Sequence, residues 1–292
     1  MTTAWVFPGQ GSQAAGMGAD LVELAGDRFA QADSLLGWSV LALDEDQLKQ
    51  TQYTQPALFV VEAILAEQLL ARCQPDCVAG HSLGEYSALC CAGVFDFETG
   101  LKLVQKRSQL MSEVTGGTMA AVMGFDRAKL EQLCAATDGA EIANDNSPDQ
   151  VVVTGLAEGV KAVTDALQAR RTVPLAVSGA FHSSYMREAA EQFAQILETV
   201  EFNSPKFPVY SNSTASRSSD PATLKQNLFD QMVSPVRWRE TLTTMTTDGV
   251  TDIWEVGPGK VLTGLAKRTV KELTRSTISN AAAVKGAIST AS

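Results

Sequence analysis

The sequence predicts an α/β fold in which a small α+β unit is inserted into a larger lobe. Short apolar segments alternate with helical patterns on both sides of residues 117–178, which is typical of a fold with a central sheet covered by helices. Within 117–178 the order changes to β-α-β-β-α-β, the pattern of a ferredoxin-like unit. A Gly-x-Ser-x-Gly segment at 80–84 joins a short apolar strand to an apolar helix. These three observations carry the fold prediction.

The first part of the large lobe is expected to contain two strands and three helices. Residues 3–7 form a buried strand that Pro8 and Gly9 end. Thr54 is expected to be the N-cap of an amphipathic helix with Pro56 in its first turn and an apolar stripe of Leu58, Val61, Leu65 and Leu69. The elements that follow are a strand at 77–79, a helix at 83–92 ended by Gly93, and a helix from the N-cap Asp96 to about Val114.

The insert and the rest of the chain supply the other elements. In the insert we expect strands at 118–123, 140–143, 151–154 and 172–177, and helices at 127–136 and 158–169. After it we expect helices at 185–200 and about 224–232, and strands at 209–211 and 252–256. Residues 281–292 are expected to form a loose tail.

Composition limits the classes of function. The 292 residues are 45% hydrophobic and 19% charged, which is typical of a globular protein with a sizeable core. The net charge of −10 argues against binding to nucleic acid or to an anionic membrane. No apolar stretch approaches the ~20 residues that span a bilayer. The N-terminal residues show no secretory signal, and together these features favour a cytoplasmic protein with no nucleic-acid or membrane partner.

Cysteine and histidine content argues against a metal site. The five cysteines include no Cys-x-x-Cys pair and the chain has only two histidines. Neither a disulfide framework nor a zinc site fits these numbers. We expect reduced cysteines in the core and no bound metal.

The segment Gly80-His81-Ser82-Leu83-Gly84 has the pattern of a nucleophile elbow. In such an elbow a sharp strand-to-helix turn exposes the serine, and the helix that follows directs its free N–H groups at the reacting oxygen. A glycine-rich turn with a capping serine is the structural alternative. His81 adjoins Ser82 and points elsewhere around an elbow, so we expect it to be structural or to line a pocket. His182 is then the candidate general base for Ser82, and a histidine beside a helix N-cap with no chemical role is the alternative.

Arg107 lies on the apolar stripe of the helix that Asp96 caps, together with Leu103, Val104 and Leu110. A guanidinium facing the core needs a partner, because an unpaired buried charge is costly. Periodicity alone leaves three possibilities open: an ion pair with a buried Asp or Glu, extension of the side chain to the surface, or binding of a carboxylate in a substrate.

Six segments together resemble the malonyl-CoA:acyl carrier protein transacylases of fatty acid synthesis and the acyltransferase domains of polyketide synthases. The resemblance runs from Phe7 to about residue 280, in the family's order. The segments are Phe7-Pro8-Gly9-Gln10-Gly11-Ser12-Gln13, Thr54-Gln55-Pro56-Ala57, Gly80-His81-Ser82-Leu83-Gly84-Glu85-Tyr86, Lys106-Arg107, Gly179-Ala180-Phe181-His182-Ser183 and Val256-Gly257-Pro258-Gly259.

The resemblance implies a role for each matching residue. The catalytic residues would be Ser82 as nucleophile, His182 as base and Gln231, whose main-chain carbonyl would orient the histidine. The N–H groups of Gln10 and Leu83 would form the oxyanion hole. The substrate-binding residues would be Arg107 on the malonyl carboxylate, Gln55, and Phe181, whose ring would crowd a 2-methyl branch.

The resemblance also implies a fold and a reaction. Residues 1–116 and 179–292 would form a large α/β-hydrolase-like lobe with a mainly parallel sheet, and residues 117–178 the small ferredoxin-like lobe. Malonyl would pass from malonyl-CoA to Ser82 and then to the phosphopantetheine thiol of acyl carrier protein, without a metal or other cofactor. We expect a monomer.

Two other classes of function remain open from the sequence. A serine hydrolase would share the elbow but would need an acidic residue to reach His182. A non-catalytic module could keep the fold only to dock a carrier protein. Docking of an acidic carrier would need a local basic face, for which the candidates are Arg237, Arg239, Lys260, Lys267, Arg268 and Lys271.

Overall fold

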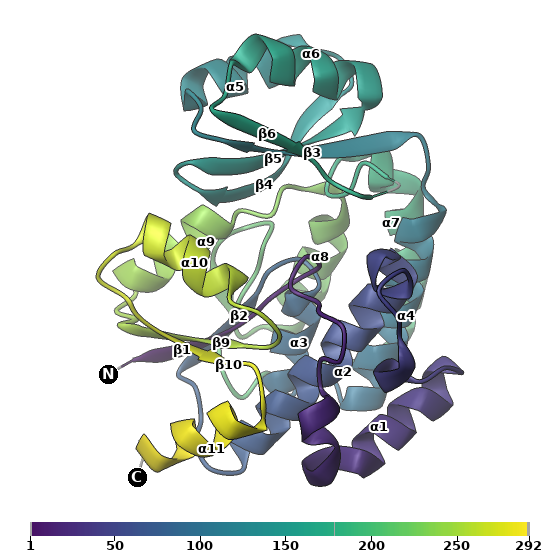
Figure 1. Ribbon diagram of the computed structural model, residues 1–292, viewed down its shortest axis with the longest axis vertical. Helices are drawn as coiled ribbons and strands as arrows, with labels where there is room; N and C mark the ends of the chain where they lie inside the picture. The colour runs from purple at the N-terminus through teal and green to yellow at the C-terminus, as the bar shows by residue number, and fades with distance from the viewer. Residues whose placement is uncertain (1, 178, 291–292) are drawn as a thin grey trace.

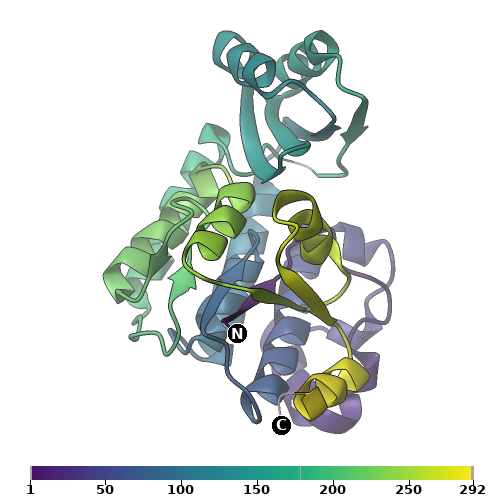
Figure 2. The same ribbon diagram turned by 90° about the vertical axis from the view of Figure 1, so that its left-hand side faces the viewer.

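The computed structural model describes residues 2–177 and 179–290, and it contains a large sheet and a small sheet. The large sheet has the strand order β10-β9-β1-β2-β7-β8, and its neighbours are parallel except for the β7–β8 pair. Figures 1 and 2 both place the small sheet and its helices at one end of the molecule. The strands of the large sheet are β1 (Thr3–Phe7), β2 (Cys77–Gly80), β7 (Val209–Tyr210), β8 (Arg217–Ser218), β9 (Asp252–Val256) and β10 (Thr274–Ile278).

The two faces of the large sheet are both covered, because alternate residues of β1 enter different cores. Trp5 and Phe7 belong to the larger cluster, with apolar side chains of the helices α1 to α4, α7 and α8. Ala4 and Val6 belong to the second cluster, with side chains of α9 and α10. The period of two along a strand therefore produces a three-layer α/β lobe. The helices of this lobe are α1 (Val22–Leu36), α2 (Thr51–Leu70), α3 (Gly84–Cys91), α4 (Phe97–Glu113), α7 (Arg187–Thr199), α8 (Pro221–Val233), α9 (Trp238–Thr247), α10 (Val261–Thr269) and α11 (Ala281–Thr290), with short 3-10 helices at Ala19–Leu21, Val40–Ala42, Gln47–Lys49 and Ser184–Met186.

The small sheet has the strand order β4-β5-β3-β6, and every neighbouring pair is antiparallel. Its two helices lie on the side of the sheet that faces away from the large lobe (Figure 1). This is the topology expected of a ferredoxin-like unit, and the mixed α/β fold class is confirmed. The limits proposed for the two lobes stay a prediction. The elements are β3 (Gly117–Met123), α5 (Arg127–Ala136), β4 (Ala140–Ser147), β5 (Gln150–Leu156), α6 (Ala157–Leu167) and β6 (Arg171–Pro174).

The expectation for α2 was wrong in two respects. The helix begins at Thr51, and Thr54 lies inside it, where its hydroxyl donates to the carbonyls of Leu48 and Gln50 instead of capping the helix. Its central part is also not amphipathic, since residues 54–66 are buried without interruption. The helix packs against α1, α3, α4 and α11, so residues 54–66 have no exposed face.

The expected loose tail is also wrong for residues 281–290, which form α11. Val284 is buried in the larger core cluster, and α11 packs against α2. The first turn is capped, because Asp20 accepts from the N–H of Ala281 and Asn280 from that of Ala283. Residues 291–292 of the expected tail lie outside the described residues. No helix within the described part of the chain is both long enough and apolar enough to cross a membrane.

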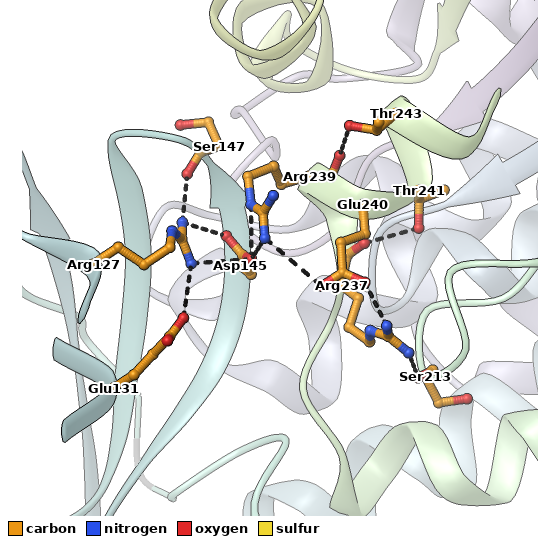
Figure 3. A network of polar contacts seen from close by, with 10 residues as sticks. All are labelled: Arg127, Glu131, Asp145, Ser147, Ser213, Arg237, Arg239, Glu240, Thr241 and Thr243. Atoms are coloured by element: carbon orange, nitrogen blue, oxygen red, sulfur yellow. Dashed lines mark hydrogen bonds and ion pairs between the residues drawn. The ribbon is translucent and has the colours of Figure 1, made fainter. Parts of the chain in front are cut away.

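The two lobes are joined by β4 and by an ion cluster on it (Figure 3). Main-chain hydrogen bonds connect Val236 with Ala143 and with Asp145, at 2.8 and 2.9 Å. The Asp145 carboxylate accepts from Arg127 of α5 at 2.9 Å and from Arg239 of α9 at 2.9 Å. One carboxylate thus forms ion pairs with two arginines that come from different lobes.

We expect Asp145→Asn to lower the free energy of unfolding by roughly 2 kcal/mol, because it leaves two half-buried arginines without their shared counter-charge. Urea unfolding followed by circular dichroism measures this loss. Asp46→Asn is the matched control, because the Asp46–Lys49 pair is mostly exposed to solvent, and it is expected to leave the stability nearly unchanged. Equal effects of the two substitutions would contradict the bridging role of Asp145.

Candidate functional site

Ser82 occupies a sharp turn between β2 and α3. Its φ of 53° is in the left-handed region, where a non-glycine residue costs about 1–3 kcal/mol. The flanking glycines make the turn possible. A Cβ on Gly80 would lie 1.8 Å from the carbonyl carbon of Gly84, and a Cβ on Gly84 would lie 2.0 Å from the carbonyl oxygen of Phe7. The Gly-x-Ser-x-Gly spacing therefore reflects close packing of the elbow on β1 and not only turn propensity.

Asn212, just beyond the end of the neighbouring strand β7, holds the elbow. Its Oδ1 accepts from the Ser82 N–H at 2.6 Å, and its Nδ2 donates to the Gly80 carbonyl at 2.5 Å. Sequence reasoning missed this residue. The available signal was its position just beyond the carboxyl end of β7, where the side chains of parallel sheets gather around a site.

His182 lies in hydrogen-bond contact with Ser82, 100 residues away in the sequence. Its Nε2 is 2.7 Å from Ser82 Oγ, and its Nδ1 is 2.8 Å from the Gln231 main-chain carbonyl. Because a carbonyl only accepts, Nδ1 carries the proton and Nε2 is free to take one from Ser82. Burial, with a further contribution from Arg107, lowers the pKa of His182 to about 3, so the ring is neutral at neutral pH.

His81 is held away from the reacting hydroxyl, as the sequence led us to expect. Its Nε2 is 2.8 Å from Asn146 Oδ1 on β4, and its ring meets Trp238 edge to face at 5.6 Å. This contact ties the elbow to the small sheet.

Arg107 is fully buried, and its guanidinium is directed at Ser82. Nη1 donates to Gln55 Oε1 at 2.7 Å, and Nη2 donates to Gln231 Oε1 at 2.9 Å and to Ser82 Oγ at 3.2 Å. Among residues 2–177 and 179–290, Arg107 makes no ion pair with a carboxylate. An ion pair with an Asp or Glu of these residues and extension to the surface are therefore both wrong as explanations of its position. Burial lowers the pKa of the guanidinium, which nevertheless remains charged.

Gln10 lines the cavity beside Ser82, and Leu83 is the next residue after Ser82 in the chain. Gln10 follows β1, and Leu83 precedes the first turn of α3. Neither main-chain N–H donates to another group within the described part of the chain. Gln10 is held through its side chain, whose Nε2 donates to Thr51 Oγ1 at 3.3 Å. Two N–H donors are thus left for an oxygen atom beside Ser82.

A cavity of about 90 Å³ adjoins Ser82 and lies between the two lobes. Its walls include Met119 of β3 and Asn144 of β4 from the small sheet, and Phe181 is buried at its side. Its volume corresponds to about three water molecules at ~30 Å³ each, so it suits a short acyl group. The lining residues are Gln10, Gln55, His81, Ser82, Met111, Met119, Asn144, Leu175, Val177, Phe181 and His182.

Three of the six basic residues considered for carrier-protein docking are paired with acidic side chains. Arg239 pairs with Asp145, Arg237 with Glu240, and Arg268 lies 3.7 Å from Asp149. The lysines of the set are exposed and make no ion pair within the described residues; they are Lys260, Lys267 and Lys271. The candidates therefore do not form one uncompensated patch. Within the same residues, no group of three or more His, Cys, Asp and Glu side chains could hold a metal ion.

Comparison with known proteins decides the family. The sequence model of the acyl transferase domain family matches residues 4–288. The chain belongs to this acyl transferase family. Within the family it is 55% identical, over 281 residues, to the malonyl CoA-acyl carrier protein transacylase of Synechocystis sp., and the alignment covers 94% of this chain and 95% of the relative. The resemblance expected from the six segments is confirmed.

Solved structures of the acyl transferase family have the same fold. The crystal structure of a malonyl-CoA:ACP transacylase from Synechocystis sp. superposes with a TM-score of 0.96 at 52% identity, covering 98% of this chain and 100% of that chain. A second match is the structure of a type II polyketide synthase acyl carrier protein in complex with its malonyl transacylase. The matched chain of that complex superposes on this chain with a TM-score of 0.94 at 38% identity, and the alignment covers 99% of this chain and 100% of that chain.

We expect Gly84→Ala to destabilise this acyl transferase by more than about 2 kcal/mol, because the new Cβ would meet the backbone of β1 and neither side can move freely. Thermal unfolding measures the effect. Gly264→Ala in α10 is the matched control, since its Cβ would have no neighbour within 4 Å, and alanine should stabilise that helix by up to about 1 kcal/mol. A Gly84→Ala protein as stable as the control would show that the elbow is not closely packed.

Proposed function

We propose that this chain transfers malonyl from coenzyme A to the phosphopantetheine thiol of an acyl carrier protein, and so supplies extender units for fatty acid synthesis. One observation carries the proposal: the fully buried Arg107 guanidinium has no carboxylate partner within the described residues and lies 3.2 Å from Ser82 Oγ. A malonyl group brings its own carboxylate to that position. The names of the Synechocystis relative and of the solved transacylases support the same reaction.

In the first half-reaction Ser82 Oγ attacks the malonyl thioester carbonyl. His182 Nε2 takes the serine proton, and the Gln231 carbonyl stabilises the imidazolium through Nδ1–H. The developing oxyanion is bound by the N–H groups of Gln10 and Leu83, and losing one such donor would cost about 2.7–4 kcal/mol. Coenzyme A leaves as its thiol after receiving the proton from His182.

In the second half-reaction the phosphopantetheine thiol gives its proton to His182 and attacks the malonyl-serine ester. Ser82 leaves, and it recovers its proton from the imidazolium. Two half-reactions through one covalent intermediate imply ping-pong kinetics. Because a thioester is exchanged for a thioester, the reaction should run in both directions. Each step uses only groups of the chain and the two thiols, so the proposal needs no cofactor.

The site favours a transferase over a hydrolase. In a hydrolase with this elbow, an Asp or Glu would bind the Nδ1–H of the histidine. Here the acceptor is the Gln231 main-chain carbonyl. A carboxylate-binding arginine beside the nucleophile also has no general use in an esterase. The paired Ser82 and His182 likewise argue against a module that only docks a carrier protein.

Several finer expectations form part of the proposal. Phe181, which lines the cavity, would crowd a 2-methyl branch, and a single methyl group is worth ~1–3 kcal/mol of discrimination. Gln55 would hold Arg107 in place for the malonyl carboxylate through its 2.7 Å contact. The five cysteines are free thiols, which suits a reducing compartment, and the cytoplasmic location and the monomeric state stay predictions.

The pH dependence of acylation should reflect the low pKa of His182. Because kcat/KM reports the base of the free enzyme, we expect acylation by acetyl-CoA to be constant from about pH 8 to about pH 5 and to fall only toward pH 3. Acetyl-CoA is the suitable substrate, since its acyl group has no carboxylate that titrates. Rapid quench followed by intact-protein mass spectrometry measures the rate. A tenfold fall per pH unit beginning near pH 6.5 would contradict a desolvated His182.

Ser82→Ala should abolish covalent malonylation, because Ser82 Oγ is the hydroxyl that lies 2.7 Å from His182 Nε2. Incubation with malonyl-CoA and intact-protein mass spectrometry would detect the adduct. Ser112→Ala is the control; Ser112 lies on α4, its hydroxyl donates to the carbonyl of Gln109, and full labelling is expected. A malonylated Ser82→Ala protein would refute the assignment of the nucleophile.

A further inference from the structure

The Gln231 side chain lies between two buried groups of opposite charge. Its Nε2 donates to Glu85 Oε2 at 2.7 Å, and its Oε1 accepts from Arg107 Nη2 at 2.9 Å. Glu85 is 1% exposed and Arg107 is fully buried. Neither makes an ion pair within the residues that the structure describes. One amide therefore separates the carboxylate from the guanidinium.

This arrangement fixes the direction of the amide. A guanidinium can only donate hydrogen bonds and a carboxylate can only accept them, so the amide oxygen must face Arg107 and the amide nitrogen must face Glu85. A second donor bond from Nε2 to the Ser82 carbonyl, at 2.9 Å, favours the same direction. A flipped amide would oppose donor to donor at Arg107 and acceptor to acceptor at Glu85.

Glu85 is itself held rigidly. It lies in the first turn of α3, where the helix dipole favours a carboxylate, three residues after Ser82. Its Oε2 also accepts from the Asn212 N–H at 3.1 Å. Asn212 is the residue whose side chain holds the Ser82 elbow. Burial raises the pKa of Glu85 to about 7, although its contacts with Gln231 and Asn212 favour the charged form.

A counter-charge held one amide away has a chemical advantage over a direct ion pair. A carboxylate bound directly to Arg107 would occupy the donors that an incoming acyl carboxylate requires, and binding would first have to break that pair. With Gln231 between them, Glu85 lies near the guanidinium without covering the donor that is directed at Ser82. The arginine therefore stays oriented and available.

We propose that Glu85 is a positioning residue for acyl-group selection: it fixes the direction of the Gln231 amide and thereby aims Arg107 at the carboxylate of the acyl group. This inference rests on the proposed malonyl transfer. The main-chain carbonyl of Gln231 is held within α8, so His182 depends less on Glu85 than Arg107 does. Loss of the Glu85 contact should thus impair malonyl transfer more than acetyl transfer.

Two conservative variants separate the position of Glu85 from its charge. Glu85→Gln keeps the length of the side chain and an oxygen for the two donors, but removes the charge. Glu85→Asp keeps the charge, but draws the oxygen back by about one carbon–carbon bond, ~1.5 Å, out of reach of Gln231 Nε2. Rapid-quench mass spectrometry measures the rates at which malonyl-CoA and acetyl-CoA acylate Ser82, and the ratio of these two rates is the quantity compared. The rate with acetyl-CoA also shows whether each variant is folded.

Relative to the unsubstituted enzyme, we expect the malonyl-to-acetyl ratio to fall at least about tenfold in Glu85→Asp and to stay within about threefold in Glu85→Gln. In a Gln231→Leu background, which lacks the amide, Glu85→Asp should change the ratio no further. An unchanged ratio in Glu85→Asp, or a larger fall in Glu85→Gln than in Glu85→Asp, would overturn the inference. Failure of the unsubstituted enzyme to accept malonyl would instead refute the proposed function.

Discussion

A buried positive charge without an ionic partner is the constraint on which this site depends. Arg107 is fully enclosed on α4, and two glutamine oxygens and Ser82 Oγ receive its hydrogen bonds. Neutral acceptors stabilise a buried guanidinium less than a carboxylate does, so the free enzyme retains a strong preference for an anion at this position. The same charge helps to keep His182 neutral. In the proposed reaction, binding of an acyl carboxylate and readiness of the base are therefore two consequences of one side chain.

The fold supplies the rigidity that such a site needs. Ser82 is fixed by glycines packed on β1 and by Asn212 from beside β7, while His182 is fixed by α8. The small sheet then closes the cavity from the other side. Its β4 binds the large lobe through Val236 and through the Asp145 cluster, and Asn146 on the same strand binds His81 next to the nucleophile. The cavity wall and the nucleophile are thus connected through one strand.

The sequence predicted those features that depend on local pattern. The strand–glycine–serine–helix spacing placed Ser82, and the Asp96 cap and apolar stripe placed α4 with Arg107 facing inward. Local pattern failed where burial was complete or where the partner lay far away in the chain. The apolar stripe of α2 predicted an exposed opposite face, but residues 54–66 are buried throughout, and α11 is stabilised by Asp20, about 260 residues earlier. Gln231 was suggested only by family resemblance, because its role uses a main-chain atom. The contacts of Asn212 with the elbow and of Glu85 with Gln231 likewise require the assembled fold.

The central claim is that Arg107 exists to bind the carboxylate of the acyl group. The most direct measurement compares Arg107→Met with the unsubstituted enzyme in acylation of Ser82 by malonyl-CoA and by acetyl-CoA, since methionine removes the charge and largely fills the space. The account predicts that the rate of acylation by malonyl-CoA falls about 10²-fold or more, because a charge-assisted bidentate contact of ~3 kcal/mol is lost. The rate of acylation by acetyl-CoA should fall less than about tenfold. Equal losses for the two acyl groups would contradict it and would make Arg107 a structural residue.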